Sequence, residues 1–175
     1  MTEQEKLLAA LQYAIRMEVD GQRYYTGQAA LMKNAAGKRL FIQLALEEDD
    51  HRHRFEAVFA AITRTQGWPG PIKRKGMVAG IKTVFAGWVV ERGAHPVAAQ
   101  TELDAVKRAI AMENVSYELY QGRFEQAVEP AQKDFYAALA AEEKGHYLVL
   151  VDYYEYMTNP ADWFAGKEHH SLDGV

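Results

Sequence analysis

The sequence has 175 residues, a formal net charge of −4 and no cysteine. This length suits one domain with a sizeable core, and the mild acidity gives no reason to expect a nucleic-acid partner. The lack of cysteine removes disulfides, zinc ribbons and iron–sulfur clusters from consideration. Residues 2–5 are charged and helix-capping rather than a secretory signal, which favours a soluble cytoplasmic protein.

The chain is expected to be helical nearly throughout, because strong helix formers dominate and proline stands only at a few boundaries. Four long helices are predicted, over residues 3–32, 36–62, 97–127 and 131–157. A capping box of Thr2 and Glu5 opens the first helix. Asn34 and Gly37 mark a tight break before the second. The predicted fold class is therefore all-α.

The stretch between the second and third predicted helices, about residues 64–96, reads as a long crossover connection. It begins at a Gly- and Pro-rich breaker over 66–71 and contains an apolar segment over 77–92. That segment falls short of the ~20 residues needed to span a bilayer. A contact with a membrane surface is less favoured for it than a core or dimer contact.

The breaks in the chain also set the expected domain organisation. An Asn-Pro pair ends the fourth predicted helix. We expect residues 1–160 to form one bundle and residues 161–175 to form an irregular tail. His169 and His170, which lie in that tail, are expected to be solvent-exposed rather than metal ligands.

An internal repeat is the strongest signal in the sequence, and it has an offset of 95 residues, the separation of Glu18 from Glu113. A single Glu-x-x-His pattern is weak evidence, because glutamate is common in this chain. Two such patterns and two Glu-x6-Tyr patterns in one register rarely arise by chance. The repeated pairs are Glu18 with Glu113, Tyr25 with Tyr120, Glu48 with Glu143, and His51 with His146.

This spacing suits the binding of two metal ions in the middle of a bundle. Residues i and i+3 lie on one helix face, so Glu48 with His51, and Glu143 with His146, can each meet one ion. Glu18 lies ~21 Å from the end of its helix and Glu48 ~18 Å from the start of the next, so the two are level in a hairpin. The predicted metal ligands are Glu18, Glu48, His51, Glu113, Glu143 and His146.

One Glu from each of two helices, with Glu-x-x-His from each of the other two, is the ligand set of di-iron and di-manganese carboxylate bundles. Four carboxylates balance two divalent cations. Oxygen and imidazole ligands suit iron or manganese, and zinc is a further candidate occupant. We therefore predict two bound iron ions, with manganese or zinc as alternatives.

Asp50 and His53 form a competing Asp-x-x-His pair on the same predicted helix. Two positions along a helix correspond to ~200° around it, so this pair faces away if Glu48 and His51 face inward. The repeat favours Glu48 and His51, because residues 145 and 148, the counterparts of the competing pair, are Gly and Leu.

Tyr25 and Tyr120 lie two turns beyond Glu18 and Glu113 on the same helix stripe. They can donate hydrogen bonds to metal-binding carboxylates. They can equally be core aromatic residues whose hydroxyls are satisfied elsewhere. The sequence leaves both interpretations open.

With these six ligands in place, the sequence resembles the rubrerythrin-like branch of the ferritin-like superfamily. The resemblance covers residues 3–157, and its specific parts are 18–25, 45–51, 111–120 and 140–146. It implies a ferritin-like antiparallel four-helix bundle with a non-haem di-iron centre that reacts with peroxide or dioxygen. It further implies bridging roles for Glu48 and Glu143, outer-carboxylate roles for Glu18 and Glu113, and nitrogen ligation by His51 and His146.

The sequence departs from the rubrerythrin pattern in two places. Rubrerythrins proper carry a cysteine-ligated rubredoxin domain that delivers electrons, whereas this sequence has no cysteine, so an external electron donor is expected. They also carry a further Glu one turn after the ligand of the third helix, which exchanges with a His when the redox state changes. Ser116 occupies that position here. The resemblance therefore implies metal binding, but it does not imply peroxidase activity by that ligand exchange.

The sequence leaves four functions open. The first is an oxidoreductase that acts on peroxide or dioxygen, and the second is an iron-oxidising or iron-storing protein. The third is a di-iron hydroxylase of an organic substrate, because residues 18–28 also resemble demethoxyubiquinone hydroxylases. The fourth is a non-enzymatic bundle that its metal stabilises. A homodimer is expected by analogy with the family.

Overall fold

The computed structural model describes residues 2–65, 67–70 and 99–165. Its four long helices are α1 (Glu3–Leu31), α2 (Ala35–Thr65), α4 (Gln100–Gln126) and α5 (Pro130–Thr158). Each helix end lies within three residues of its predicted position. The prediction of an all-α fold is confirmed.

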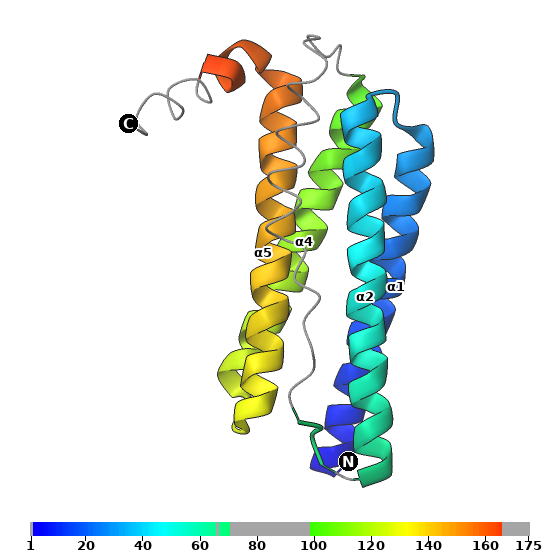
Figure 1. Cartoon of the computed structure of the whole chain (residues 1–175), viewed down its shortest axis with the longest axis vertical. Coiled ribbons are helices and arrows are strands. Elements are labelled where there is room, and N and C mark those ends of the chain that lie inside the picture. The colour runs from blue at the N-terminus through cyan, green and yellow to red at the C-terminus, as the bar shows by residue number, and fades with distance from the viewer. Residues whose placement is uncertain (1, 66, 71–98, 166–175) are drawn as a thin grey trace.

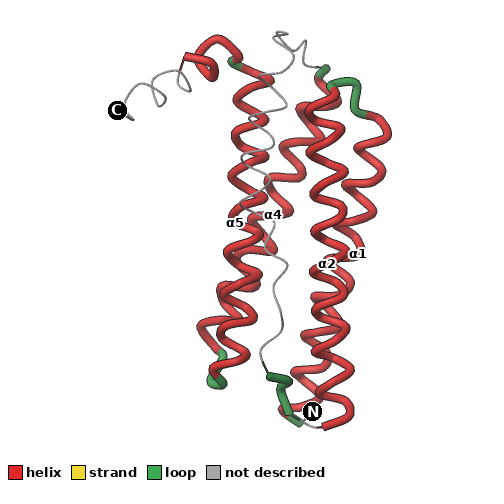
Figure 2. Tube along the Cα trace, viewed as in Figure 1, coloured by secondary structure: helices red, strands yellow, loops and turns green. Residues whose placement is uncertain are grey.

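The four helices form two antiparallel hairpins, α1 with α2 and α4 with α5, which lie side by side in one bundle (Figures 1 and 2). α2 and α4 run in the same direction, so the chain between them joins opposite ends of the bundle. This long connection is the one expected of a ferritin-like bundle. The course of residues 71–98, and with it the apolar segment 77–92, lies outside the described residues.

Local side-chain contacts explain where the first two helices begin. Thr2 and Glu5 form the predicted capping box: the Thr2 hydroxyl accepts from the Glu5 amide at 3.2 Å, and the Glu5 carboxylate accepts from the Thr2 amide at 2.7 Å. Asn34 Oδ1 accepts from the amides of Ala36 and Gly37 at 2.9 and 3.2 Å, which is an N-cap arrangement.

Gly37 lies in the first turn of α2, within the helix predicted over 36–62. A Cβ atom built on Gly37 would overlap the hydroxyl of Tyr153, whose fully buried ring belongs to α5. The glycine is therefore required for the close approach of the two hairpins at this end of the bundle.

The apolar core is divided into two clusters by a polar layer at mid-bundle. One cluster surrounds Leu40, Phe41 and Tyr153, and the other surrounds Phe55 and Leu139. The charged residues buried between these clusters come from all four helices. Burial of charge in this position requires partners, because an isolated charge in a protein interior costs several kcal/mol.

Residues 160–165 are helical, although irregular structure was expected from residue 161 onward. Trp163 explains this turn, because its indole packs edge-on against Tyr156 with ring centroids 5.3 Å apart. Its Nε1 donates to Asp152 Oδ1 at 2.9 Å. His169 and His170 lie outside the described residues.

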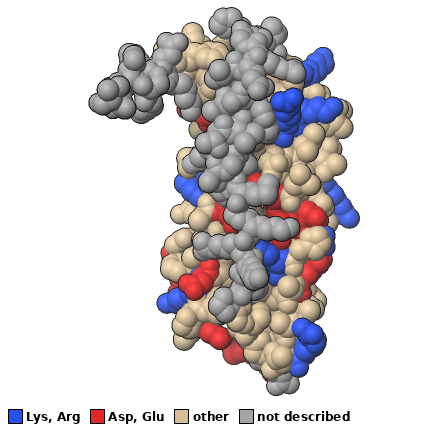
Figure 3. Space-filling view, viewed as in Figure 1, with Lys and Arg blue, Asp and Glu red and all other residues tan. Residues whose placement is uncertain are grey.

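The surface in Figure 3 carries basic and acidic side chains interspersed over the described part of that face. None of the described helices is both long enough and apolar enough to cross a membrane.

Candidate metal centre

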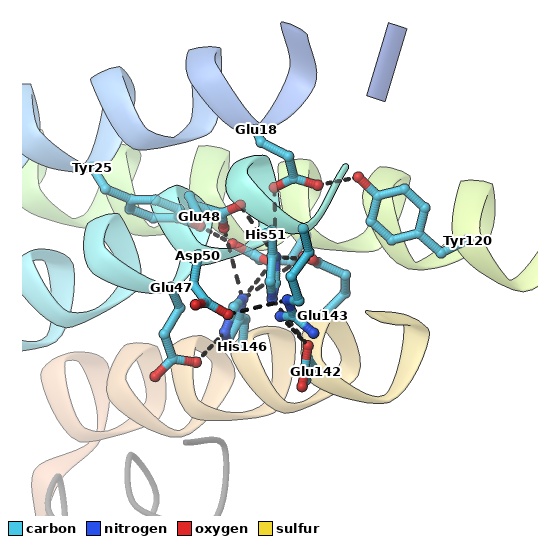
Figure 4. A network of polar contacts seen from close by, with 12 residues as sticks. Glu18, Tyr25, Glu47, Glu48, Asp50, His51, Tyr120, Glu142, Glu143 and His146 are labelled. Atoms are coloured by element: carbon cyan, nitrogen blue, oxygen red, sulfur yellow. Dashed lines mark hydrogen bonds and ion pairs between the residues drawn. The ribbon is translucent and has the colours of Figure 1, made fainter. Parts of the chain in front are cut away.

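The six predicted ligands meet in the polar layer at mid-bundle. Figure 4 labels all of them except Glu113. Each of the six residues is at most 5 % exposed. α1 and α4 each contribute one glutamate, and α2 and α5 each contribute a glutamate and a histidine. The structure therefore brings together the residues that the repeat selected: Glu18, Glu48, His51, Glu113, Glu143 and His146.

The candidate ligands form two groups that share two carboxylates. In each group, one ligand atom from every member lies within 4.8 Å of those of the others. One group holds Glu18 and His51, the other holds Glu113 and His146, and both contain Glu48 and Glu143. Two cation positions with two shared carboxylates are the arrangement of a dinuclear site.

Both histidines direct Nδ1 toward the carboxylates. His51 Nδ1 lies 2.9 Å from Glu143 Oε1 and 3.5 Å from Glu18 Oε2. His146 Nδ1 lies 3.3 Å from Glu113 Oε2. The two imidazole rings are nearly parallel, with an interplanar angle of 19° and centroids 5.5 Å apart.

The residues present fit a pair of metal ions. Among the described residues, His51 Nδ1 and both carboxylate oxygens of Glu143 are buried and form no assigned hydrogen bond, and the 2.9 Å contact between His51 Nδ1 and Glu143 Oε1 is an ion-pair contact. Buried polar atoms of this kind are rare unless an ion or water satisfies them. A cation between them satisfies all three atoms, and the oxygen and imidazole set suits iron or manganese.

Without bound cations, protons must relieve the repulsion among the carboxylates. Burial, followed by the charge of Glu143, raises the pKa of Glu48 well above its usual value. The same two causes raise the pKa of Glu113 to about 8, against the opposing effect of His146. Burial also works to raise the pKa of Glu143, but His51 and His146 outweigh it and hold that pKa well below its usual value.

The pKa values of the two histidines are shifted as well. Burial alone would lower their pKa values. The carboxylate of Glu143 outweighs burial at His51, and that of Glu113 outweighs it at His146, so the pKa of each imidazole is raised well above its usual value. In the metal-free protein, protons on the imidazoles and on some of the carboxyls therefore balance the charge that bound cations would otherwise balance.

Tyr25 and Tyr120 each reach across from one hairpin to the other. The Tyr25 hydroxyl, on α1, donates to Glu113 on α4. The Tyr120 hydroxyl, on α4, donates to Glu18 on α1. Both rings also belong to the apolar clusters, so the two interpretations left open by the sequence hold together. Burial, followed by the facing glutamate, raises the pKa of each hydroxyl well above its usual value.

Two further glutamates hold the outer nitrogens of the histidines, and neither was predicted. Glu47 Oε2 lies 2.8 Å from His146 Nε2, and Glu142 Oε2 lies 3.2 Å from His51 Nε2 (Figure 4). A carboxylate on Nε2 fixes the imidazole tautomer and leaves Nδ1 free for an ion. The signal was present in the sequence, because Glu47 and Glu142 are also related by the offset of 95 residues.

Arg54 breaks the symmetry of this arrangement. Its Nη2 donates to Glu142 Oε2 at 2.6 Å, and its Nε lies 3.1 Å from Asp50 Oδ2. Residue 149, the counterpart of Arg54 in the repeat, is Val. Glu47 instead accepts from the neutral amide of Gln43 at 3.2 Å. The arginine therefore neutralises the carboxylate behind only one of the two histidines.

The competing pair on α2 stays outside the cluster, as predicted. The side chain of His53 is 59 % exposed and contacts Asp49 rather than the buried glutamates. The side chain of Asp50 is one-third exposed, and Arg54 links it to the buried glutamates.

A four-helix bundle with these buried Glu and His clusters is consistent with the di-metal carboxylate proteins. Residues 9–154 match the rubrerythrin family, and the chain belongs to this family. The fold is similar to that of a hypothetical protein from Pyrococcus furiosus, with a TM-score of 0.65 and 24 % sequence identity over 87 % of this chain and 90 % of that chain. No curated protein matches the sequence.

Proposed function

We propose that this protein is a non-haem di-iron oxidoreductase that acts on hydrogen peroxide or dioxygen with electrons from a donor outside these 175 residues. The observation that supports this most directly is the pair of buried ligand groups that share Glu48 and Glu143. Two ions held by common carboxylates can act together on the two oxygen atoms of one O–O bond.

Each residue would have a defined role around two ions. Glu48 and Glu143 would bridge them. Glu18 with His51 would complete one position, and Glu113 with His146 would complete the other. These pairs belong to the two ligand groups that the geometry defines. When bound, iron supplies the redox equivalents and a template for the O–O bond.

The residues around the ligands orient them and control protons. Glu47 and Glu142 hold the Nε2 protons of the histidines, so that each Nδ1 presents its lone pair to the centre. Tyr25 and Tyr120 donate to the outer carboxylates and fix their orientation. These hydroxyls keep their protons at neutral pH, because their pKa values are raised well above the usual value by burial and the neighbouring glutamates.

Metal content tests the first part of this proposal. Protein reconstituted anaerobically with Fe(II) is expected to retain about two iron ions per chain after gel filtration. Glu143→Ala removes a shared carboxylate and is expected to lose most of this iron. Glu118→Ala, at an exposed position on α4, is the matched control and should retain it. A well-folded wild-type protein that retains no iron would refute the proposal.

The oxidant is tested on the loaded protein. Anaerobic Fe(II) protein is mixed rapidly with one equivalent of hydrogen peroxide or of dioxygen, and the absorbance of the oxidised iron is followed. We expect at least one oxidant to oxidise both ions in a single fast phase, and the faster oxidant identifies the substrate. Iron that both oxidants leave reduced over minutes would indicate a structural metal instead.

A further inference from the structure

A cavity of about 370 Å³ lies between α1 and α4 and opens beside the candidate metal centre. Its inner wall includes Glu48, Glu113 and Tyr25, which are buried. Its outer wall includes Tyr13 and Val115, which are 49 % and 54 % exposed. The cavity therefore leads from the surface of the protein to two of the candidate ligands.

Small side chains keep this space open. Gly21 on α1 and Ser116 on α4 are counterparts in the repeat, and both line the cavity. A Cβ atom on Gly21 would stand 3.4 Å from Glu48 Cδ, in van der Waals contact with a candidate ligand.

The volume exceeds what the proposed oxidants require. Peroxide or dioxygen fills about the space of two water molecules, roughly 60 Å³ at ~30 Å³ each. A cavity of about 370 Å³ instead falls within the range of pockets that hold organic ligands, roughly 300–1,000 Å³.

The chemistry of the walls limits which organic ligand fits. Met17, Met112 and Val115 provide apolar contacts on both sides, and methionine packs well against aromatic rings. Asp20 and Arg108, which have opposite charges, line its exposed rim. The inner end presents the oxygens of Glu48 and Glu113, which accept hydrogen bonds but give an anion no positive side chain to pair with. A matching ligand is therefore aromatic, neutral, and carries a hydroxyl group that can donate to Glu48 or Glu113.

We propose that this cavity binds a small neutral aromatic diol, with hydroquinone as its simplest representative, and that the diol is the reducing substrate of the centre. This inference rests on the proposed function, which requires an electron donor outside the chain. In the reaction with peroxide, both O–H bonds of hydroquinone and the O–O bond break. Two electrons and two protons pass to peroxide, so one hydroquinone and one hydrogen peroxide give one benzoquinone and two water molecules.

Binding can be measured without turnover on the full chain loaded with Zn(II), which does not change oxidation state. Anaerobic titration by saturation-transfer NMR compares hydroquinone with 1,4-dimethoxybenzene, which cannot donate a hydrogen bond, and with 4-hydroxybenzoate, which is an anion. We expect hydroquinone to bind at least tenfold more tightly than either comparison ligand. Equal binding of all three, or no binding of hydroquinone at millimolar concentration, would overturn the proposal.

Cavity-filling variants locate the binding site. Ser116→Phe and Ala111→Phe place a ring in the cavity from two turns of α4, and each is expected to weaken hydroquinone binding at least tenfold. Ala60→Phe, at an exposed position on α2 outside the cavity lining, is the matched control and should bind as wild type does. Far-UV circular dichroism verifies the fold of each variant. Unchanged affinity in both folded cavity variants would place the ligand elsewhere and refute the assignment.

The two proposals can fail separately. Metal retention is measured on the same preparations, and hydroquinone binding is measured in parallel on the metal-free chain. Retained metal without hydroquinone binding would refute the substrate assignment and leave the di-iron proposal standing. Binding without retained metal would refute the di-iron proposal, and with it the diol as reducing substrate.

Discussion

Replacement of Arg54 by methionine removes the cation that neutralises Glu142 behind His51. The side chains of Arg54 and Glu142 are only 9 % and 11 % exposed, and their closest atoms are 2.6 Å apart. Loss of one partner of a buried pair costs roughly 3–5 kcal/mol, because it leaves the other charge uncompensated. His51 Nε2 still contacts Glu142 at 3.2 Å, so we expect the lower end of this range, about 3 kcal/mol.

Thermal unfolding of the metal-free protein, followed by far-UV circular dichroism, measures this effect. For a chain of this size, about 3 kcal/mol corresponds to a fall in Tm of roughly 6–12 °C. Arg52→Met is the matched control on the same helix. Arg52 pairs with Asp49 and Glu56, but these partners are 32 % and 44 % exposed, and surface ion pairs contribute less than about 1 kcal/mol.

A double variant separates the uncompensated charge from the loss of packing. Arg54→Met with Glu142→Gln removes both charges, so its stability should recover by a large part of the loss seen for Arg54→Met alone. The reasoning is refuted if Arg54→Met unfolds within 1 °C of Arg52→Met, or if the double variant is no more stable than Arg54→Met.

Three further predictions follow from single contacts or protons. Gly37→Ala should destabilise the protein by about 1–3 kcal/mol in urea unfolding, because its Cβ overlaps the Tyr153 hydroxyl; Gly27→Ala, where a Cβ meets no atom within 4 Å, should be neutral or stabilising by up to about 1 kcal/mol. Tyr25→Phe and Tyr120→Phe should each weaken Fe(II) retention about 10- to 100-fold in competition with a chelator, because an outer carboxylate loses its hydrogen bond; unchanged retention in both would show that the hydroxyls do not position the ligands. The metal-free protein should lose stability between pH 5 and pH 8. The pKa of Glu113 is raised to about 8 in the folded state, so the folded protein keeps a proton on this carboxyl over that range. The unfolded chain has already released this proton, because Glu113 has its usual, lower pKa there, and the free energy of unfolding therefore falls as the pH rises. Thermal unfolding at several pH values checks this, and a metal-free Tm that rises over the same range would contradict it.

Much of the fold and of the candidate site could be predicted because both depend on local sequence patterns. Helix-forming composition and a few Gly, Pro and Asn breaks place four helices to within three residues. The spacing of Glu and His along each helix then selects one face, and the repeat distinguishes Glu48 and His51 from the neighbouring Asp50 and His53. Helix geometry places the selected residues of each helix on one face, and the packing of the two hairpins buries all six.

What could not be predicted depends on contacts between hairpins. Adjacent helix positions point about 100° apart, so Glu47 should turn away from the face that carries Glu48. It is buried because His146, on the facing helix, directs Nε2 toward it. The overlap of Gly37 with Tyr153 likewise joins residues on different hairpins, and no periodicity within one helix encodes such a contact.

The repeat makes the six candidate ligands symmetric, but their surroundings differ. Arg54 neutralises the carboxylate behind His51, whereas the described partners of Glu47, behind His146, are that histidine and a neutral amide. A carboxylate without a neighbouring cation is the stronger hydrogen-bond acceptor and makes its imidazole the more basic ligand. The cavity reaches Glu113 but not Glu18. The opening therefore leads toward the candidate position of Glu113 and His146, where the imidazole would be the more basic ligand. A substrate that entered between α1 and α4 would meet this position first.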